Sequence, residues 1–267
     1  ATEHQKMKIA SIEAMWHTEP APAGFTIFGL PDVSAQKTHA EIKIPWALGL
    51  IATRSISKEV PGIMNLVEHA EQRIRSGQQA YAALQHLRVD KQDSAARAQF
   101  EQHQADLGYA LLLKRHIADP TQASETDIER AAWSIIPNVP VMFWSFRLMV
   151  GLGFFFILLF ATAFVVTARR HIEKHRGLLR LALYCLPLPW LAAELGWIVA
   201  EYGRQPWVIE GVLPTFLGVS SVSAGQVMFS LIGFVLFYST LAVVDVFLML
   251  RVVRQGPEFW SGHEGAG

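Results

Sequence analysis

The sequence predicts an all-α membrane protein made of two unlike parts. Three apolar runs follow residue 144, each with roughly the 20 residues that a spanning helix needs. The residues before about 140 are charged and mixed, and they contain no apolar run long enough to cross a bilayer. The formal net charge is zero, so no electrostatic footprint for nucleic acid exists. We therefore expect a mostly helical region outside the membrane, residues 1–143, and a membrane region with a tail, residues 144–267.

Outside the predicted membrane region, helical spacing of apolar residues predicts helices over 60–87 and 99–117. A third helix is expected over 124–136, because this segment opens with the capping composition Ser-Glu-Thr-Asp. The stretch 20–50 contains several prolines and is expected to form loops and short extended pieces. The predicted apolar stripe of the first helix consists of Ile63, Leu66, Val67 and Ala70.

The membrane-spanning helices are expected at about 146–168, 181–201 and 227–250. The second run contains Pro187 and Pro189. Membrane helices tolerate prolines when neighbouring groups satisfy the freed carbonyls, so we expect a kink near Pro189.

The loops between the predicted spans differ in charge. The first loop holds one acid, Glu173, and five basic residues: Arg169, Arg170, Lys174, Arg176 and Arg180. The second holds Arg204 against Glu201 and Glu210. The positive-inside rule makes the first loop cytoplasmic and the second external, which puts residues 1–143 outside.

Four side chains share one face of the second predicted span: Trp190, Glu194, Trp197 and Glu201. A buried acid in hydrocarbon must be paired, protonated or bound to a metal. These acids either pair with polar groups on neighbouring helices or line a cofactor or proton path. Because Glu201 is followed directly by Tyr-Gly-Arg204, we favour the second interpretation.

Arg147 and Met149 open the first predicted span. A methionine in a membrane helix usually serves packing, but it can also be an axial haem ligand opposite histidine. Arg147 could then neutralise a propionate or the reduced haem. All ten histidines lie outside the predicted spans, so an intramembrane histidine ligand is expected to come from a segment beyond this chain.

Lys8 and Glu13 lie in a segment with two interpretations. The first is a solvated amphipathic helix. The second is a quinol site, where a carboxylate accepts a proton and a cation orients the head group. Since both residues lie far along the chain from Glu201, we expect their replacement to slow quinol oxidation and to spare oxygen reduction fed by an artificial donor.

Several strings resemble subunit I of the cytochrome bd quinol oxidases, in the same order along the chain. They are Lys-Ile-Ala-Ser-Ile-Glu-Ala-Met-Trp at 8–16, Pro-Trp-Ala-Leu-Gly-Leu-Ile-Ala-Thr-Arg at 45–54, Phe-Arg-Leu-Met at 146–149, and Gly-Trp-Ile-Val-Ala-Glu-Tyr-Gly-Arg-Gln-Pro-Trp at 196–207. The chain resembles the C-terminal half of that subunit, in its long quinol-loop form. It begins without an initiator methionine, which agrees with a piece of a longer polypeptide.

The resemblance implies a role for each singled-out residue. Met149 would be an axial ligand of the low-spin haem iron, and Arg147 would stabilise the reduced form of that haem. Glu201 would be a ligand at the high-spin haem iron, with Trp197 between haems and Arg204 facing haem propionates. Lys8 and Glu13 would belong to the quinol site.

The resemblance also implies a setting and partners. Quinol would be oxidised at the periplasmic face, and oxygen reduced to water, through low-spin haem b, high-spin haem b and haem d. The expected location is the bacterial cytoplasmic membrane, with residues 1–143 periplasmic. The expected partners are the N-terminal half of the same subunit, subunit II, possible small accessory subunits, and membrane lipid. The alternative is a non-enzymatic membrane-anchored helical module, which predicts tolerance of Glu201→Ala.

Overall fold

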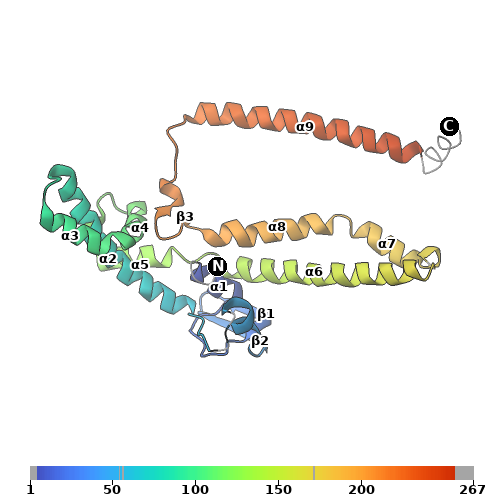
Figure 1. The fold of residues 1–267 in the computed structure, drawn as a ribbon, viewed down its shortest axis with the longest axis horizontal. Helices are drawn as coiled ribbons and strands as arrows, with labels where there is room; N and C mark the ends of the chain where they lie inside the picture. The colour runs from blue at the N-terminus through green and yellow to red at the C-terminus, as the bar shows by residue number, and fades with distance from the viewer. Residues whose placement is uncertain (1–4, 54, 56, 171, 256–267) are drawn as a thin grey trace. The chain divides into compact units, whose positions relative to one another are not determined.

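The computed structural model describes residues 5–53, 55, 57–170 and 172–255 (Figure 1). Its α-helices are α1 (Lys6–Glu13), α2 (Ile63–Val89), α3 (Ser94–His103), α4 (Leu107–Leu111), α5 (Glu125–Trp133), α6 (Val139–Ala168), α7 (Arg176–Tyr184), α8 (Leu188–Glu201) and α9 (Ala224–Gln255). Its strands are β1 (Phe25–Asp32), β2 (Lys37–Ile44), β3 (Trp207–Ile209) and β4 (Leu213–Pro214). The chain divides into one unit that ends at Gly218 and a second that begins at Val219. The predicted all-α membrane fold is confirmed.

Helix α2 organises the region before the first span. Ile63, Val67, Ala70 and Ile74 recur at helical spacing along one side and are buried. This matches the predicted stripe, except that Leu66 is only partly buried. The core on this face also takes residues from α1, α4, α5 and the start of α6. Fully burying a side chain such as Ile63 contributes about 1.5–3 kcal/mol, so this stripe fixes α2 against its neighbours.

The prediction of one helix over 99–117 is wrong. The segment forms α3 and α4, separated by a 3-10 turn at Gln104–Asp106, and a second 3-10 turn, Leu112–Arg115, follows α4. The break lets the chain pack closely on α2, where a Cβ at Gly77 would overlap the Asp106 carbonyl. Arg73 of α2 also donates a hydrogen bond to Asp106, with 2.5 Å between Nε and Oδ1. Tertiary packing therefore overrides the continuous helical pattern.

The helix predicted over 124–136 is confirmed as α5, and its cap is the expected one. Ser124 accepts a hydrogen bond from the Asp127 amide, and the Asp127 side chain accepts one from the Ser124 amide. This reciprocal arrangement is a capping box, which stabilises the first turn of the helix.

The proline-rich stretch 20–50 is more regular than the sequence predicted. Strands β1 and β2 pair as an antiparallel hairpin, in which Phe25 lies opposite Ile44 and Phe28 opposite Ile42. The connecting turn is held by Asp32, whose carboxylate accepts bonds from the amides of Ser34 and Ala35. Short extended pieces are therefore present, but they form one paired ribbon.

The first and third predicted spans lie within helices, and the second covers the end of α7, a three-residue break and α8. Helices α6 and α9 are long and apolar enough to cross a membrane, and α7 with α8 passes the same test as one span bent by 40°. The interruption between α7 and α8 falls just before Pro189, which then occupies the first turn of α8, where a missing amide costs nothing. Helix α6 begins before the predicted span, because Asn138 caps it by accepting a bond from the Val141 amide.

Candidate functional site

The first part of the site is helix α1, which is packed into the protein. Lys8, Ser11 and Glu13 are buried, together with Ala10 and Ile12. The interpretation of this segment as a solvated amphipathic helix is therefore wrong. A helix that buries a lysine and a glutamate must provide partners for both charges.

Glu13 receives its partners from β1 and α6. Its Oε2 accepts a hydrogen bond from the Thr26 amide at 3.0 Å and lies 3.4 Å from Nη2 of Arg147. The side chains of Glu13 and Arg147 are only 3% and 7% exposed. No local pattern indicates this pair, because the two residues are 134 positions apart in the sequence.

The guanidinium of Arg147 is also held by backbone oxygens. It donates to the carbonyls of Ile12 at 2.6 Å and Phe143 at 3.1 Å, and to the carbonyl of Thr26. It also lies over the Phe143 ring, 3.3 Å from the ring centre. Arg147 thus joins α1, β1 and α6 at one point, and only its buried Nε lacks a partner among the described residues.

The carboxyl of Glu13 titrates near neutrality in this setting. Burial raises its pKa from 4.5 to about 7, against the opposing effects of the Arg147 charge and the Thr26 hydrogen bond. A group with a pKa near ambient pH can both accept and release a proton. Glu13 therefore has the property that a general base requires.

Lys8 connects α1 to the end of α8. Its ammonium donates a hydrogen bond to the Ala200 carbonyl at 2.8 Å. Burial lowers the pKa of Lys8, and the nearby Arg204 charge lowers it further, while Glu201 and Glu210 act in the opposite direction. Lys8 and the segment that carries Glu201 and Arg204 are therefore neighbours in space, although they lie far apart in the sequence.

Gly203 makes this close approach possible. A Cβ at this position would overlap the end of the Met142 side chain and lie 3.2 Å from Cε of Lys8. Met142 is fully buried in the first turns of α6, so it has little freedom to move away. The glycine in Glu-Tyr-Gly-Arg thus allows α1, α6 and the end of α8 to meet.

Glu201 and Arg204 form a second carboxylate–guanidinium pair, at the boundary of the predicted membrane region. Their closest atoms are 3.3 Å apart, and the side chains are 46% and 39% exposed. Nε of Arg204 is buried and has no partner among the described residues. Trp197, on the same helix face as Glu201, is 62% exposed. This face of α8 is therefore open to a ligand or to another part of an assembly.

Met149 lies on the side of α6 that packs on α8. Its sulfur would stand 3.1 Å from a Cβ added at Gly196. Arg147, two residues earlier, is instead directed at α1 and β1. The structure therefore separates these two predicted residues, with Arg147 beside Glu13 and Met149 beside α8.

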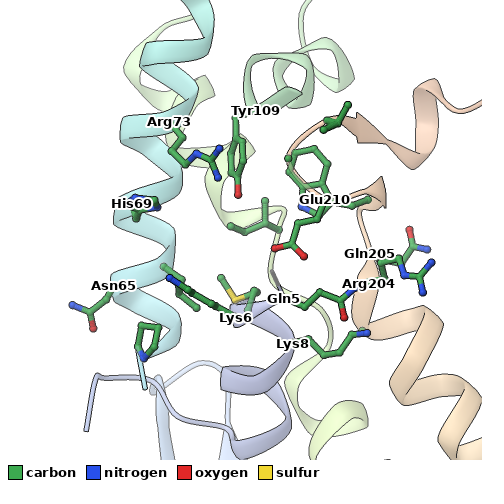
Figure 2. A pocket seen from close by; sticks show the side chains of 18 of the residues that line it. Gln5, Lys6, Lys8, Asn65, His69, Arg73, Tyr109, Arg204, Gln205 and Glu210 are labelled. Carbon is green, nitrogen blue, oxygen red and sulfur yellow. The ribbon is translucent and has the colours of Figure 1, made fainter. Parts of the chain in front are cut away.

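A cavity of about 550 Å³ lies between α1, α2, α4 and the β3–β4 segment (Figure 2). Figure 2 shows Lys8 extending toward the segment that carries Arg204, across from Arg73 and Tyr109. The Arg73 guanidinium lies 4.1 Å from the centre of the Tyr109 ring. Sequence reasoning missed Arg73, Tyr109 and Glu210 as lining residues, because their local patterns resemble those of any surface helix or loop.

In the part of the chain that the structure describes, no group of three or more His, Cys, Asp or Glu side chains could hold a metal ion.

The chain belongs to the family described as cytochrome bd terminal oxidase subunit I, whose family model matches residues 1–257. It is 39% identical over 253 residues to cytochrome bd-II ubiquinol oxidase subunit 1 of Escherichia coli, covering 95% of this chain and 49% of that protein. It is 29% identical over 263 residues to cytochrome bd ubiquinol oxidase subunit 1 of Bacillus subtilis, covering 98% of this chain and 44% of that protein. The chain thus spans about half the length of these curated relatives.

Proposed function

We propose that this chain is the C-terminal part of the haem-bearing subunit of a quinol oxidase, which oxidises quinol and reduces oxygen to water. Family membership supports this class of activity. The observation that carries the proposal is the contact between two sets of residues that the sequence keeps far apart. Lys8 and Glu13 meet the outer end of α6 through Arg147 and the end of α8 through Ala200.

In this proposal Glu13 accepts a proton from the quinol head group. Its pKa of about 7 suits that task, and the Thr26 amide and Arg147 hold its carboxylate in one orientation. The Lys8 ammonium orients the head group or stabilises its developing negative charge. Because Lys8 also contacts Ala200, the site of proton removal adjoins the segment that carries Glu201 and Arg204.

The described residues fit haem groups in three respects. The buried Nε of Arg204 lacks a partner and can serve a propionate. Trp197 and Glu201 share an open face of α8. Met149 lies between α6 and α8, where Gly196, which has no side chain, leaves space for the Met149 thioether. The haems, when bound, would supply the one-electron acceptors and the iron at which oxygen is reduced.

We further propose Met149 as a ligand of a low-spin haem b and Glu201 as a ligand at a high-spin haem b, with haem d completing the set. Arg147 acts on the reduced low-spin haem through its charge, since most of its donors are already bound within the protein. The missing ligands come from the N-terminal half of the same subunit. Subunit II, and small accessory subunits where present, would complete the enzyme.

The proposed orientation puts residues 1–143 in the periplasm and the basic loop after α6 in the cytoplasm of a bacterium. Quinol oxidation outside releases protons outside, whereas water formation draws protons from inside. A proton-motive force then arises without a pump.

The experiment that tests the proposal compares two donors in the complete oxidase. Glu13→Gln should abolish most quinol-driven oxygen consumption, while consumption driven by an artificial one-electron donor to the haems survives. Glu125→Gln is the matched control, because Glu125 is an exposed glutamate that pairs with an arginine, Arg75. Equal loss of both activities in Glu13→Gln would contradict a role in quinol oxidation.

Lys8→Gln gives a less selective test, because Lys8 also holds the end of α8. We expect it to reduce quinol oxidation strongly and the artificial-donor activity partly. If Lys8→Gln kept both activities, a role for Lys8 in quinol oxidation would be contradicted.

Glu201→Gln tests the second half of the proposal. This change keeps size and hydrogen bonding but removes the charge, so it separates shape from ligation. It should abolish quinol-driven oxygen consumption and alter the high-spin haem spectrum, while the low-spin spectrum remains. Normal oxygen consumption would contradict the ligand role and indicate that Glu201 only pairs with Arg204 at the membrane boundary.

The alternative of a non-enzymatic membrane module is less well supported. A simple anchor has no need for a buried glutamate with a pKa near 7, and the relatives are named as oxidase subunits. The module predicts that Glu201→Ala is tolerated and that the complete protein has no haem spectrum.

A further inference from the structure

The β1–β2 hairpin and the turn after it expose many apolar side chains. Ile42 and Ile44 are 60% and 45% exposed, and they alternate along β2 with the charged residues Glu41 and Lys43. The turn that follows adds three large exposed side chains: Trp46 at 64%, Leu50 at 64% and Ile51 at 69%. Contiguous apolar surface of this kind marks an interaction site on a folded protein. We call this set, with Phe28, the apolar hairpin face.

Contacts with neighbouring residues fix the conformation of the apolar hairpin face. Leu48, between Trp46 and Leu50, is buried in a small core with Met15, Ala23 and Val60. Lys43 is paired with Glu19 and Glu41, so the charged side chains of this region are engaged with one another. Trp46 has a φ of 60°, a left-handed backbone that a non-glycine residue rarely adopts. The packing thus holds an exposed indole in an uncommon conformation.

This face is continuous with the surface of the first membrane helix. The Phe28 ring lies 5.6 Å from that of Trp144, and the Phe25 ring lies 6.3 Å from that of Phe146, between ring centres. Trp144 and Phe146 belong to α6 at the start of its span, and exposed apolar residues continue along α6 through Leu148 and Phe154. Figure 1 shows the hairpin beside the first turns of α6.

We propose that the apolar hairpin face lies in the interfacial layer of the phospholipid bilayer, on the side where α6 begins. Aromatic side chains are enriched at this level of membrane proteins, and apolar residues beside them enter the boundary of the acyl chains. The residues that define the face are all apolar or aromatic, and its Phe28 contacts Trp144 of α6. The hairpin would hold Glu13 at the depth where lipid-soluble molecules reach the protein, since Thr26 of β1 bonds to Glu13.

Spin labels in the complete oxidase, reconstituted in nanodiscs of phosphatidylethanolamine and phosphatidylglycerol, test this proposal. Single labels are placed at Ile42→Cys and Leu50→Cys, in a background without other reactive cysteines, including Cys185→Ala. Ala35→Cys is the matched control, because Ala35 is exposed in the polar turn of the same hairpin. Power saturation then compares collisions with oxygen, which partitions into lipid, and with a water-soluble nickel chelate.

Labels at positions 42 and 50 should collide several-fold more with oxygen than with nickel, and the label at position 35 should show the reverse. Nickel-dominated collisions at 42 and 50 would put the face in water and overturn the proposal. Immobile labels that neither reagent reaches would put a protein segment on the face, which also overturns it. Each variant is measured only if its size-exclusion profile and haem absorption match those of the parent, so misfolding cannot produce a false result. The outcome does not depend on the roles proposed for Glu13 or Glu201.

Discussion

Two carboxylate–guanidinium pairs in this protein have nearly the same separation but very different surroundings. Glu13 and Arg147 lie 3.4 Å apart, are almost fully buried, and come from helices more than one hundred residues apart in sequence. Glu201 and Arg204 lie 3.3 Å apart, are close to half exposed, and belong to a single turn at the end of α8. The first pair fastens three elements together, whereas the second remains open to a ligand. The comparison indicates that burial, rather than distance, determines how much such a pair contributes to stability and how exposed its groups are to a ligand.

Arg147→Met should produce the largest effect on stability. It leaves Glu13 buried without its cation, which costs about 3–5 kcal/mol, whereas Arg204→Met removes an exposed pair worth at most about 1 kcal/mol. Methionine keeps much of the contact with the Phe143 ring, so packing changes little. Thermal unfolding of the purified complete oxidase measures both variants. Adding Glu13→Gln to Arg147→Met should recover part of the loss, and equal shifts in Tm for the two single variants would contradict the comparison.

Glycine substitutions test whether buried and exposed positions of this protein also differ in packing. A Cβ at Gly108 would overlap the backbone of Gly211, and one at Gly203 would overlap the Met142 side chain, whereas nothing lies within 4 Å of a Cβ at Gly151 in α6. Gly108→Ala should cost about 1–3 kcal/mol or more, Gly203→Ala less, and Gly151→Ala close to nothing. Thermal unfolding of the three variants checks this order. A Gly151→Ala variant as unstable as Gly108→Ala would mean that another segment packs against α6 there.

The pH dependence of stability should report the titration of Glu13. The pKa of Glu13 rises from 4.5 to about 7 on folding, so the folded state binds this proton more tightly than the unfolded state. The contribution of Glu13 to stability is therefore complete below about pH 4.5 and is lost as the pH rises through about 7. The parent oxidase should lose more Tm than Glu13→Gln between about pH 5 and pH 8. An unchanged pH slope in Glu13→Gln would contradict the raised pKa.

Met149→Leu should have only a small effect on stability but a specific effect on spectra. The shapes are similar, so packing should cost less than about 1.5 kcal/mol. Loss of the thioether should remove the low-spin haem signal. Gly196→Ala is a useful companion, because its new methyl would press on the Met149 sulfur and should shift the midpoint potential without removing the ligand. An unchanged low-spin spectrum and midpoint in Met149→Leu would rule out the ligand role.

Several features could be predicted from the sequence because they depend on local pattern. Apolar runs placed α6, α9 and the bent α7–α8 pair, since the number of residues that cross a bilayer is fixed by its thickness. The Ser124 cap was predicted for a similar reason, because its partners lie within three residues of it. The broken helix before Ile117 could not be predicted, because its cause is contact with Gly77 and Arg73 of α2.

The sequence by itself determined the membrane architecture, the family, and the residue types available for chemistry, because these depend on composition and on motifs that are read along the chain. Only the tertiary structure decided how those residues are combined. It joined Glu13 to Arg147, directed Met149 toward α8 instead of toward Arg147, and brought Lys8 to the carbonyl of Ala200. The physical reason is that a charge buried far from water needs a partner, and the partner can come from any segment that the fold brings within reach.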